Sequence, residues 1–145
     1  MGNCIKEVVQ KYVLKHKTRD PFKLAELLGI EVQKGTPGCA GCYMFLKNHR
    51  YIFLDQNLEE RELLQVMAHE LGHAILHKKQ NCYFIRHKTL LLNSKTEQEA
   101  NIFAAELLID DGIILEHPEY TNSQLARLLG YEERLIEWWM QNNNK

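Results

Sequence analysis

The sequence predicts a mainly helical α+β domain with a small antiparallel β-sheet or hairpin. Apolar residues recur at helical spacing along most of the chain, which indicates helices packed on a common core. Two aromatic and β-branched runs, "CYMFLK" and "RYIFLD", are separated by Asn48 and His49 and predict a β-hairpin. The 145 residues contain no linker or internal repeat, so we expect a single domain over residues 1–145.

Apolar spacing and terminal residues define the individual elements. Asp20 and Pro21 are typical of the N-cap and first position of a short helix. Asn57 with Glu60 fits a capping box at the start of a longer helix. The predicted elements are helices at 4–16, 21–28, 58–77 and 96–109, a final helix pair within 122–141, a short strand at 30–35, and a loop over 78–93 with a short strand at 82–85.

Composition and charge exclude several classes of protein. Hydrophobic residues make up 45% of the chain and charged residues 26%, as in globular rather than disordered proteins. The net charge is −1 and basic residues are dispersed, so we expect no direct nucleic-acid partner. No apolar run is long enough to cross a membrane, and charged residues interrupt the N-terminus where a signal peptide would lie. We therefore expect a cytoplasmic protein whose cysteines are thiols.

The segment "AHELGHAILH", residues 68–77, places His69 and His73 four residues apart. On a helix the two lie about 40° apart around the axis and about 6 Å apart along it, so their imidazoles can converge on one ion. Glu70 lies beside this pair, where it can reach a water at the ion without binding the ion. Neutral nitrogen ligands, an open coordination position and a nearby carboxylate base are what a zinc hydrolase requires. We therefore predict His69 and His73 as metal ligands and Glu70 as the catalytic base.

The same spacing also fits a buried helix whose histidines hydrogen-bond to backbone or carboxylate groups. A third protein ligand, which catalytic zinc usually has, favours the metal. "TEQEANIFAAELL" offers Glu97 and Glu99, although each also fits a helix-start capping box, with Ser94 and Thr96 respectively. The two glutamates point about 200° apart, so only one of them can face the metal. Asn101, one turn after Glu97, could accept a ring N–H from a ligating histidine and so favours Glu97.

Together with "GCYMFLKNHRYIFLD" upstream, "AHELGHAILH" and "EQEANIFAAELL" resemble the ImmA/IrrE metallopeptidases over roughly residues 20–112. The resemblance implies a zincin-like fold and places the third ligand on Glu97. Characterised members of that family are bacterial or phage proteins that cut helix-turn-helix repressors and so release mobile-element or stress genes. The resemblance therefore implies a metallo-endopeptidase with a helix-turn-helix repressor as its substrate. Zn²⁺ is the expected ion, with Mn²⁺ as the alternative.

Other polar residues near the motif have less specific signals. His77 shares the histidine stripe, but it lies about 12 Å along the axis from His69 and is too far away to be the third ligand. The alternatives for His77 are that it lines the cleft, that it hydrogen-bonds the ligand set, or that it packs in the core. Many zinc peptidases also use a donor that stabilises the oxyanion, and the spacing selects none here. The candidates for that donor are Tyr43, Tyr83, Arg86 and His87.

The C-terminal sequence "QLARLLGYEERLIEWWM" has the pattern of a helix-turn-helix. Glu132, Glu133 and Glu137 sit where a recognition helix would meet phosphates, so we interpret it as a packing helix pair. The sequence thus favours a zinc-dependent endopeptidase. The alternative is a non-proteolytic, metal-stabilised module that inactivates a repressor or antitoxin by binding it. Glu70 favours the peptidase, because a structural metal site needs no base.

Overall fold

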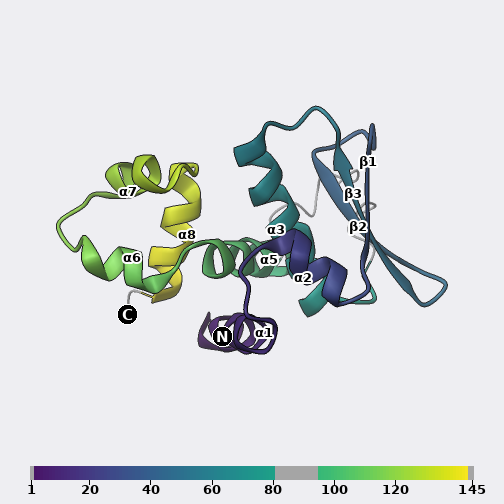
Figure 1. Ribbon diagram of the computed structural model, residues 1–145, viewed down its shortest axis with the longest axis horizontal. Helices are drawn as coiled ribbons and strands as arrows, with labels where there is room; N and C mark the ends of the chain where they lie inside the picture. The colour runs from purple at the N-terminus through teal and green to yellow at the C-terminus, as the bar shows by residue number, and fades with distance from the viewer. Residues whose placement is uncertain (1, 81–94, 144–145) are drawn as a thin grey trace.

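The computed structural model describes residues 2–80 and 95–143, and it confirms a mainly helical α+β architecture (Figure 1). The expected strand at 82–85 and three of the oxyanion candidates, Tyr83, Arg86 and His87, lie outside the described residues. The described helices are α1 (Gly2–His16), α2 (Pro21–Leu27), α3 (Glu60–Leu76), α5 (Lys95–Leu108), α6 (Asp111–Glu116), α7 (Asn122–Leu129) and α8 (Glu133–Asn143). The described strands are β1 (Glu31–Gly35), β2 (Gly41–Leu46) and β3 (His49–Asp55).

The three strands form one sheet in the order β1-β3-β2. The antiparallel hairpin of β2 and β3 is confirmed, with Tyr43 opposite Ile52. Its turn residues are Lys47 and Asn48 rather than the expected Asn48 and His49, because His49 already belongs to β3. The φ angles of Lys47 and Asn48, 50° and 67°, match the left-handed backbone that a tight hairpin turn requires. β1 pairs with β3 in parallel, so the sheet is mixed rather than wholly antiparallel.

The helix starts agree only partly with the expected caps. The Asp20 carboxylate accepts a hydrogen bond from the Phe22 amide at 2.9 Å, as an N-cap should. The capping box at Asn57 is wrong, because α3 begins later, at Glu60. The backbone N–H of Asn57 instead donates a hydrogen bond to the Asp55 carboxylate at 3.0 Å. The chain therefore completes a turn after β3 before the helix starts.

Helices α3 and α5 form the centre of the molecule. In Figure 1 the sheet lies on one side of this pair, and helices α6, α7 and α8 lie on the other. Helix α3 packs on β2, on β3 and on α5, and α5 also contacts α1 and α8. The largest fully buried side chains come from all of these layers and include Tyr43, Ile52, Leu54, Met67, Leu71, Phe103, Leu107, Leu125, Leu135 and Ile136. The two helices that carry the metal motif are thus held in the core by packing on both sides.

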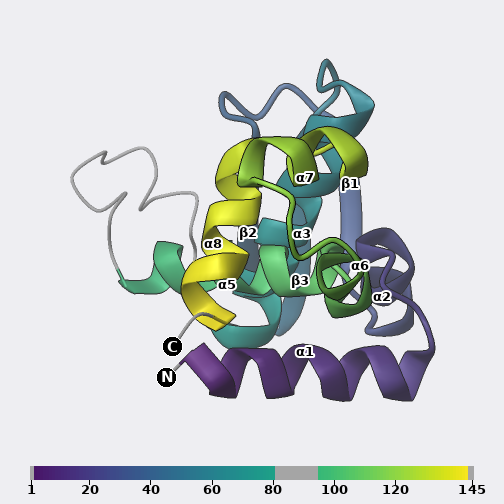
Figure 2. The same cartoon turned by 90° about the vertical axis from the view of Figure 1, so that its left-hand side faces the viewer.

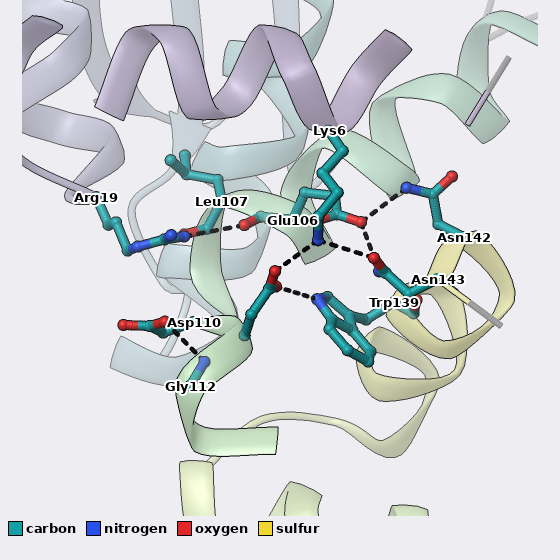
Figure 3. Close-up of polar contacts among 10 residues, drawn as sticks. Lys6, Arg19, Glu106, Leu107, Asp110, Gly112, Trp139, Asn142 and Asn143 are labelled. Carbon is teal, nitrogen blue, oxygen red and sulfur yellow. Dashed lines mark hydrogen bonds and ion pairs between the residues drawn. The ribbon is translucent and has the colours of Figure 1, made fainter. Parts of the chain in front are cut away.

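A buried polar network joins the two ends of the chain to α5 (Figure 3). Glu106 is 3% exposed, and its carboxylate accepts hydrogen bonds from the Asn142 and Asn143 amides, both at 2.7 Å, and from Lys6 at 3.3 Å. Lys6 also pairs with Asp111 at 2.7 Å. Figure 2 shows the start of α1 close to the end of α8. The network fixes α1 and α8 on the face of α5 that carries Glu106.

Candidate metal centre and its cleft

Three side chains from α3 and α5 converge on one point. His69 Nε2 lies 3.0 Å from Glu97 Oε1, and His73 Nε2 lies 2.9 Å from Glu97 Oε2. The two Nε2 atoms are 3.2 Å apart. The donor atoms of all three residues lie within 4.8 Å of one another. The structure therefore brings together the three residues that the sequence predicts as ligands.

Local structure explains this convergence. His69 and His73 are one turn apart on α3, and Glu97 lies in the first turn of α5. The helices approach closely because Gly72 has no side chain, and a Cβ at that position would lie 3.1 Å from Phe103 of α5. The spacing within α3 sets the two imidazoles side by side, and the close crossing brings the carboxylate to them.

The electrostatics of the cluster match a metal-ligand set. Burial lowers the pKa of His73 and outweighs the neighbouring Glu97, which acts in the opposite direction. Burial alone would raise the pKa of Glu97, but hydrogen bonds from His69 and His73 hold it well below its usual range. At neutral pH His73 is therefore a neutral imidazole and Glu97 a carboxylate. Two imidazole nitrogens with one carboxylate are a common catalytic zinc set, so the residues present fit a divalent ion.

Glu70 lies next to this cluster and is fully buried. Strand β2 passes directly beside it, because a Cβ on Gly41 would lie 3.3 Å from Glu70 Cγ and 2.6 Å from Val66 Cγ1. No larger residue fits at position 41 without moving Val66 or Glu70. The glycine therefore lets the sheet approach α3 at the residue that the sequence predicts as the base.

The site opens into a cleft of about 340 Å³. His69, Glu70 and Glu97 line this cleft, whereas His73, which is as fully buried as Glu70, does not line it. One wall belongs to the C-terminal helix pair, a role that the sequence did not reveal. The residues of the walls are Ala40, Leu58, Glu62, Gln65, Val66, Asn101, Ala104, Glu132, Arg134, Leu135 and Trp138.

Comparison with known proteins agrees with this geometry. Residues 25–134 match the family model described as the IrrE N-terminal-like domain, a peptidase family. The chain belongs to the ImmA/IrrE family of metallopeptidases. It is 36% identical over 135 residues to "Uncharacterized immunity region protein 2" of Bacillus phage phi105, covering 90% of this chain and 85% of that protein. It is 31% identical over 119 residues to "Metallopeptidase ImmA" of Bacillus subtilis (strain 168), covering 80% and 69% respectively.

No solved structure matches the chain. Within residues 2–80 and 95–143, no helix has the length and apolar character needed to span a bilayer.

A second histidine–carboxylate pair lies beside the first. His77 Nε2 is 2.8 Å from Glu99 Oε1, and His77 Nδ1 is 3.3 Å from His73 Nδ1. His77 thus contacts the ligand set, which is one of the roles expected for it. The expected partner of a ligating histidine was Asn101, but that residue lies in the cleft wall with no hydrogen bond to a histidine among the described residues. Helix spacing alone could not show that Glu99 reaches His77.

Two further expectations change. Tyr43 is fully buried, and its hydroxyl donates to the backbone carbonyl of Lys78, so its hydroxyl does not face the cleft. Thr96 lies inside α5 rather than at its N-cap, and Glu99 faces His77 rather than the start of the helix. Tyr43 is the one oxyanion candidate among the described residues, and its side chain is part of the core.

Proposed function

We propose that this protein is a zinc-dependent endopeptidase in which His69, His73 and Glu97 hold the ion and Glu70 is the general base. The convergence of three donor atoms within 4.8 Å is the observation that carries this proposal. Glu70 and two of the ligands line the same cleft, so a peptide can reach the ion and the base from one side. Mn²⁺ is the alternative ion, because the same donors also bind it.

Each residue has a separate task in this reaction. His69, His73 and Glu97 would hold a divalent ion, which when bound would act as a Lewis acid towards the scissile carbonyl and the attacking water. Glu70 accepts the proton of the attacking water and passes it to the leaving amine. Burial keeps bulk water away from Glu70, so its carboxylate interacts more strongly with a proton donor in the cleft. His73, which does not line the cleft, would hold the ion without contacting the peptide.

We further propose a helix-turn-helix transcriptional repressor as the substrate, whose cleavage derepresses mobile-element, phage or stress genes. The relatives support this context, since one is named for a phage immunity region and another is named a metallopeptidase. The cleft wall built by Leu135 and Trp138 adds an apolar surface beside the ion, which suits the apolar side chains of a small helical domain. The C-terminal helix pair would then contact the substrate rather than DNA.

The test compares wild type with Glu70→Gln and with Glu60→Gln, an exposed carboxylate on the same helix. Gln is nearly isosteric with Glu but takes no proton at neutral pH, so Glu70→Gln should keep its zinc and lose about 10²–10⁴-fold in cleavage rate. Glu60→Gln should match wild type. Zinc content is measured by mass spectrometry, and cleavage is followed on labelled casein and on a repressor encoded beside the gene.

The outcome separates the peptidase from the stoichiometric binder. If Glu70→Gln inactivates the repressor as well as wild type does, with no fragments on a gel, peptidase chemistry is not the mechanism and the binding module is correct. Cleavage that depends on both zinc and Glu70 supports the endopeptidase. Cleavage of casein but not of the repressor would retain the enzyme and reject the proposed substrate.

A further inference from the structure

The chain Glu99–His77–His73 runs from a partly exposed carboxylate to a buried metal ligand. Glu99 Oε1 lies 2.8 Å from His77 Nε2, and His77 Nδ1 lies 3.3 Å from His73 Nδ1. The other ring nitrogen of His73 is the one that faces Glu97, at 2.9 Å. His77 is the C-cap of α3, and Glu99 lies in α5, so the contact also crosses between the two helices that carry the ligands.

We propose that His77 and Glu99 are positioning residues that fix the tautomer and ring orientation of His73 for metal binding through Nε2. The proposal rests on the metal site of the proposed function. His77 and Glu99 would then support metal binding without being ligands themselves and without acting as the base.

When an ion is bound at Nε2 of His73, the ring protons along this chain have one consistent arrangement. His73 can bind an ion through Nε2 only if its proton is on Nδ1, which then acts as a donor. His77 Nδ1 must accept that hydrogen bond, so the proton of neutral His77 is on Nε2. That N–H donates to Glu99, whose carboxylate can only accept. Reversing any one tautomer leaves two N–H groups or two lone pairs facing each other.

The location of His73 explains why such support is needed. Its side chain is fully buried, so solvent does not reach its Nδ1 proton. A buried donor without an acceptor is unfavourable, and the alternative tautomer would direct a proton at the metal position. The His77 side chain is 9% exposed and that of Glu99 is 24% exposed, so the chain becomes more accessible towards the carboxylate. Partners of this kind typically contribute about 10–100-fold to metal affinity.

A simpler interpretation is that the pair only ties the end of α3 to α5. That interpretation predicts a loss of stability on substitution but no specific effect on metal binding. The two interpretations are distinguished by Zn²⁺ affinity and by the protonation pattern of the rings, neither of which a purely structural contact controls.

The experiment measures Zn²⁺ affinity of the full chain by competition with a chromogenic chelator. The matched pair is His77→Leu and His77→Asn, whose side chains have the same number of heavy atoms and both branch at Cγ, but only Asn offers an oxygen near the position of Nδ1. His77→Leu and Glu99→Ala should each weaken Zn²⁺ binding by about 10–100-fold. His77→Asn should recover most of that loss. Glu97→Ala, which removes a ligand, should lower affinity more than Glu99→Ala, and Glu60→Gln should leave it unchanged.

A direct readout is the ¹⁵N spectrum of histidine-labelled wild type loaded with Zn²⁺. We expect His73 with its proton on Nδ1 and His77 with its proton on Nε2. A His77 protonated on Nδ1, or His77→Leu with a lower melting temperature but unchanged Zn²⁺ affinity, would overturn the proposal. If wild type itself binds no Zn²⁺, the proposed function fails, and that result is distinct because it appears before any substitution is made.

Discussion

Phe103 of α5 packs directly against Gly72 of α3, one residue before the metal-ligand candidate His73. A Cβ on Gly72 would lie 3.1 Å from Phe103 Cβ and 3.1 Å from Cδ1, tighter than ordinary van der Waals contact. Phe103 is fully buried and cannot move into solvent. The distance between the two helices at the metal site is therefore set by the missing side chain of Gly72.

Gly72→Ala should push α5 away from α3 and weaken Zn²⁺ binding. Overpacking costs about 1–3 kcal/mol, whereas replacing glycine by alanine inside a helix contributes about 1 kcal/mol in the other direction. The net loss in the free energy of unfolding should therefore reach at most about 2 kcal/mol. Strain of about 1.4 kcal/mol transferred to the site corresponds to a tenfold loss of Zn²⁺ affinity. Urea denaturation and chelator competition measure the two effects.

The matched control for this substitution is Gly112→Ala in α6, where a Cβ would meet only Asp110 Oδ1, at an ordinary 3.5 Å. It should leave Zn²⁺ affinity unchanged. Phe103→Leu combined with Gly72→Ala should recover part of the affinity by making room. Equal Zn²⁺ affinity in Gly72→Ala and wild type would show that this contact does not set the geometry of the site.

Gly41→Ala should impair catalysis more than metal binding. The new Cβ would lie 2.6 Å from Val66 Cγ1 and 3.3 Å from Glu70 Cγ. Val66 is β-branched and has one preferred rotamer in a helix, so it cannot turn aside cheaply. We expect a loss of about 1–3 kcal/mol in the free energy of unfolding. Displacement of Glu70 should lower kcat by about 10²-fold while zinc content is retained.

Gly35→Ala is the control, because a Cβ on this β1 glycine meets nothing within 4 Å. Its kcat on labelled casein and its zinc content should equal those of wild type. The double variant Gly41→Ala with Val66→Ala removes the clashing methyl and should restore part of kcat. If Gly41→Ala loses zinc and activity together, the close approach supports the ligands rather than the base.

The candidate ligands could be predicted because their positions follow from local rules. The four-residue spacing of His69 and His73 sets both imidazoles on one helix stripe, whatever the rest of the fold. The choice of Glu97 over Glu99 required more, since both fit a helix-start capping box, and it was drawn from Asn101 one turn later and from the family resemblance. The site geometry agrees with the expectation drawn from the family resemblance, and Glu97 is the glutamate that lies against both histidines.

The rest of the site depends on contacts between elements, which no local pattern encodes. The pairing of His77 with Glu99 needs the crossing of α3 and α5, and the cleft wall at Trp138 needs the final helix pair to fold back over α3. The expected cap at Asn57 failed for a related reason. The Asp55 carboxylate at the end of β3 accepts a hydrogen bond from the backbone N–H of Asn57, so a contact with the preceding strand determines where α3 begins.

Metal removal should loosen the fold without abolishing it. Two ligands stand on α3, but Met67 and Leu71 of that helix are fully buried and keep it in place without an ion. An ion that binds only the folded chain stabilises it by about 4 kcal/mol at a thousandfold excess over Kd. We therefore expect a chelator to lower Tm by about 8–16 °C while helical circular dichroism persists at 25 °C. Complete unfolding at that temperature would instead identify a structural site, as in a zinc finger.

Lys6 should stabilise the protein up to high pH and lose that effect above its usual pKa. Burial tends to lower the pKa of Lys6, but its hydrogen bond to Asp111 and the charges of Glu106 and Asp111 raise it overall above 10.5. A cation whose pKa is raised on folding contributes in full below its unfolded pKa and loses that contribution as pH rises through the folded value. Lys6→Met should therefore cost about 1–3 kcal/mol at pH 8.

The measurement is urea denaturation of wild type and Lys6→Met at pH 8 and at pH 11, and the difference between the two proteins should shrink at the higher pH. Burial also raises the pKa of Tyr131, but that residue affects both proteins equally and cancels in the difference. Lys23→Met is the control, since its partner Glu26 and Lys23 itself are mostly exposed and such pairs contribute at most about 1 kcal/mol. A difference that is equal at pH 8 and at pH 11 would show that Lys6 acts through packing of its side chain beside Trp139, whose ring centre lies 5.5 Å from the ammonium group, rather than through its charge.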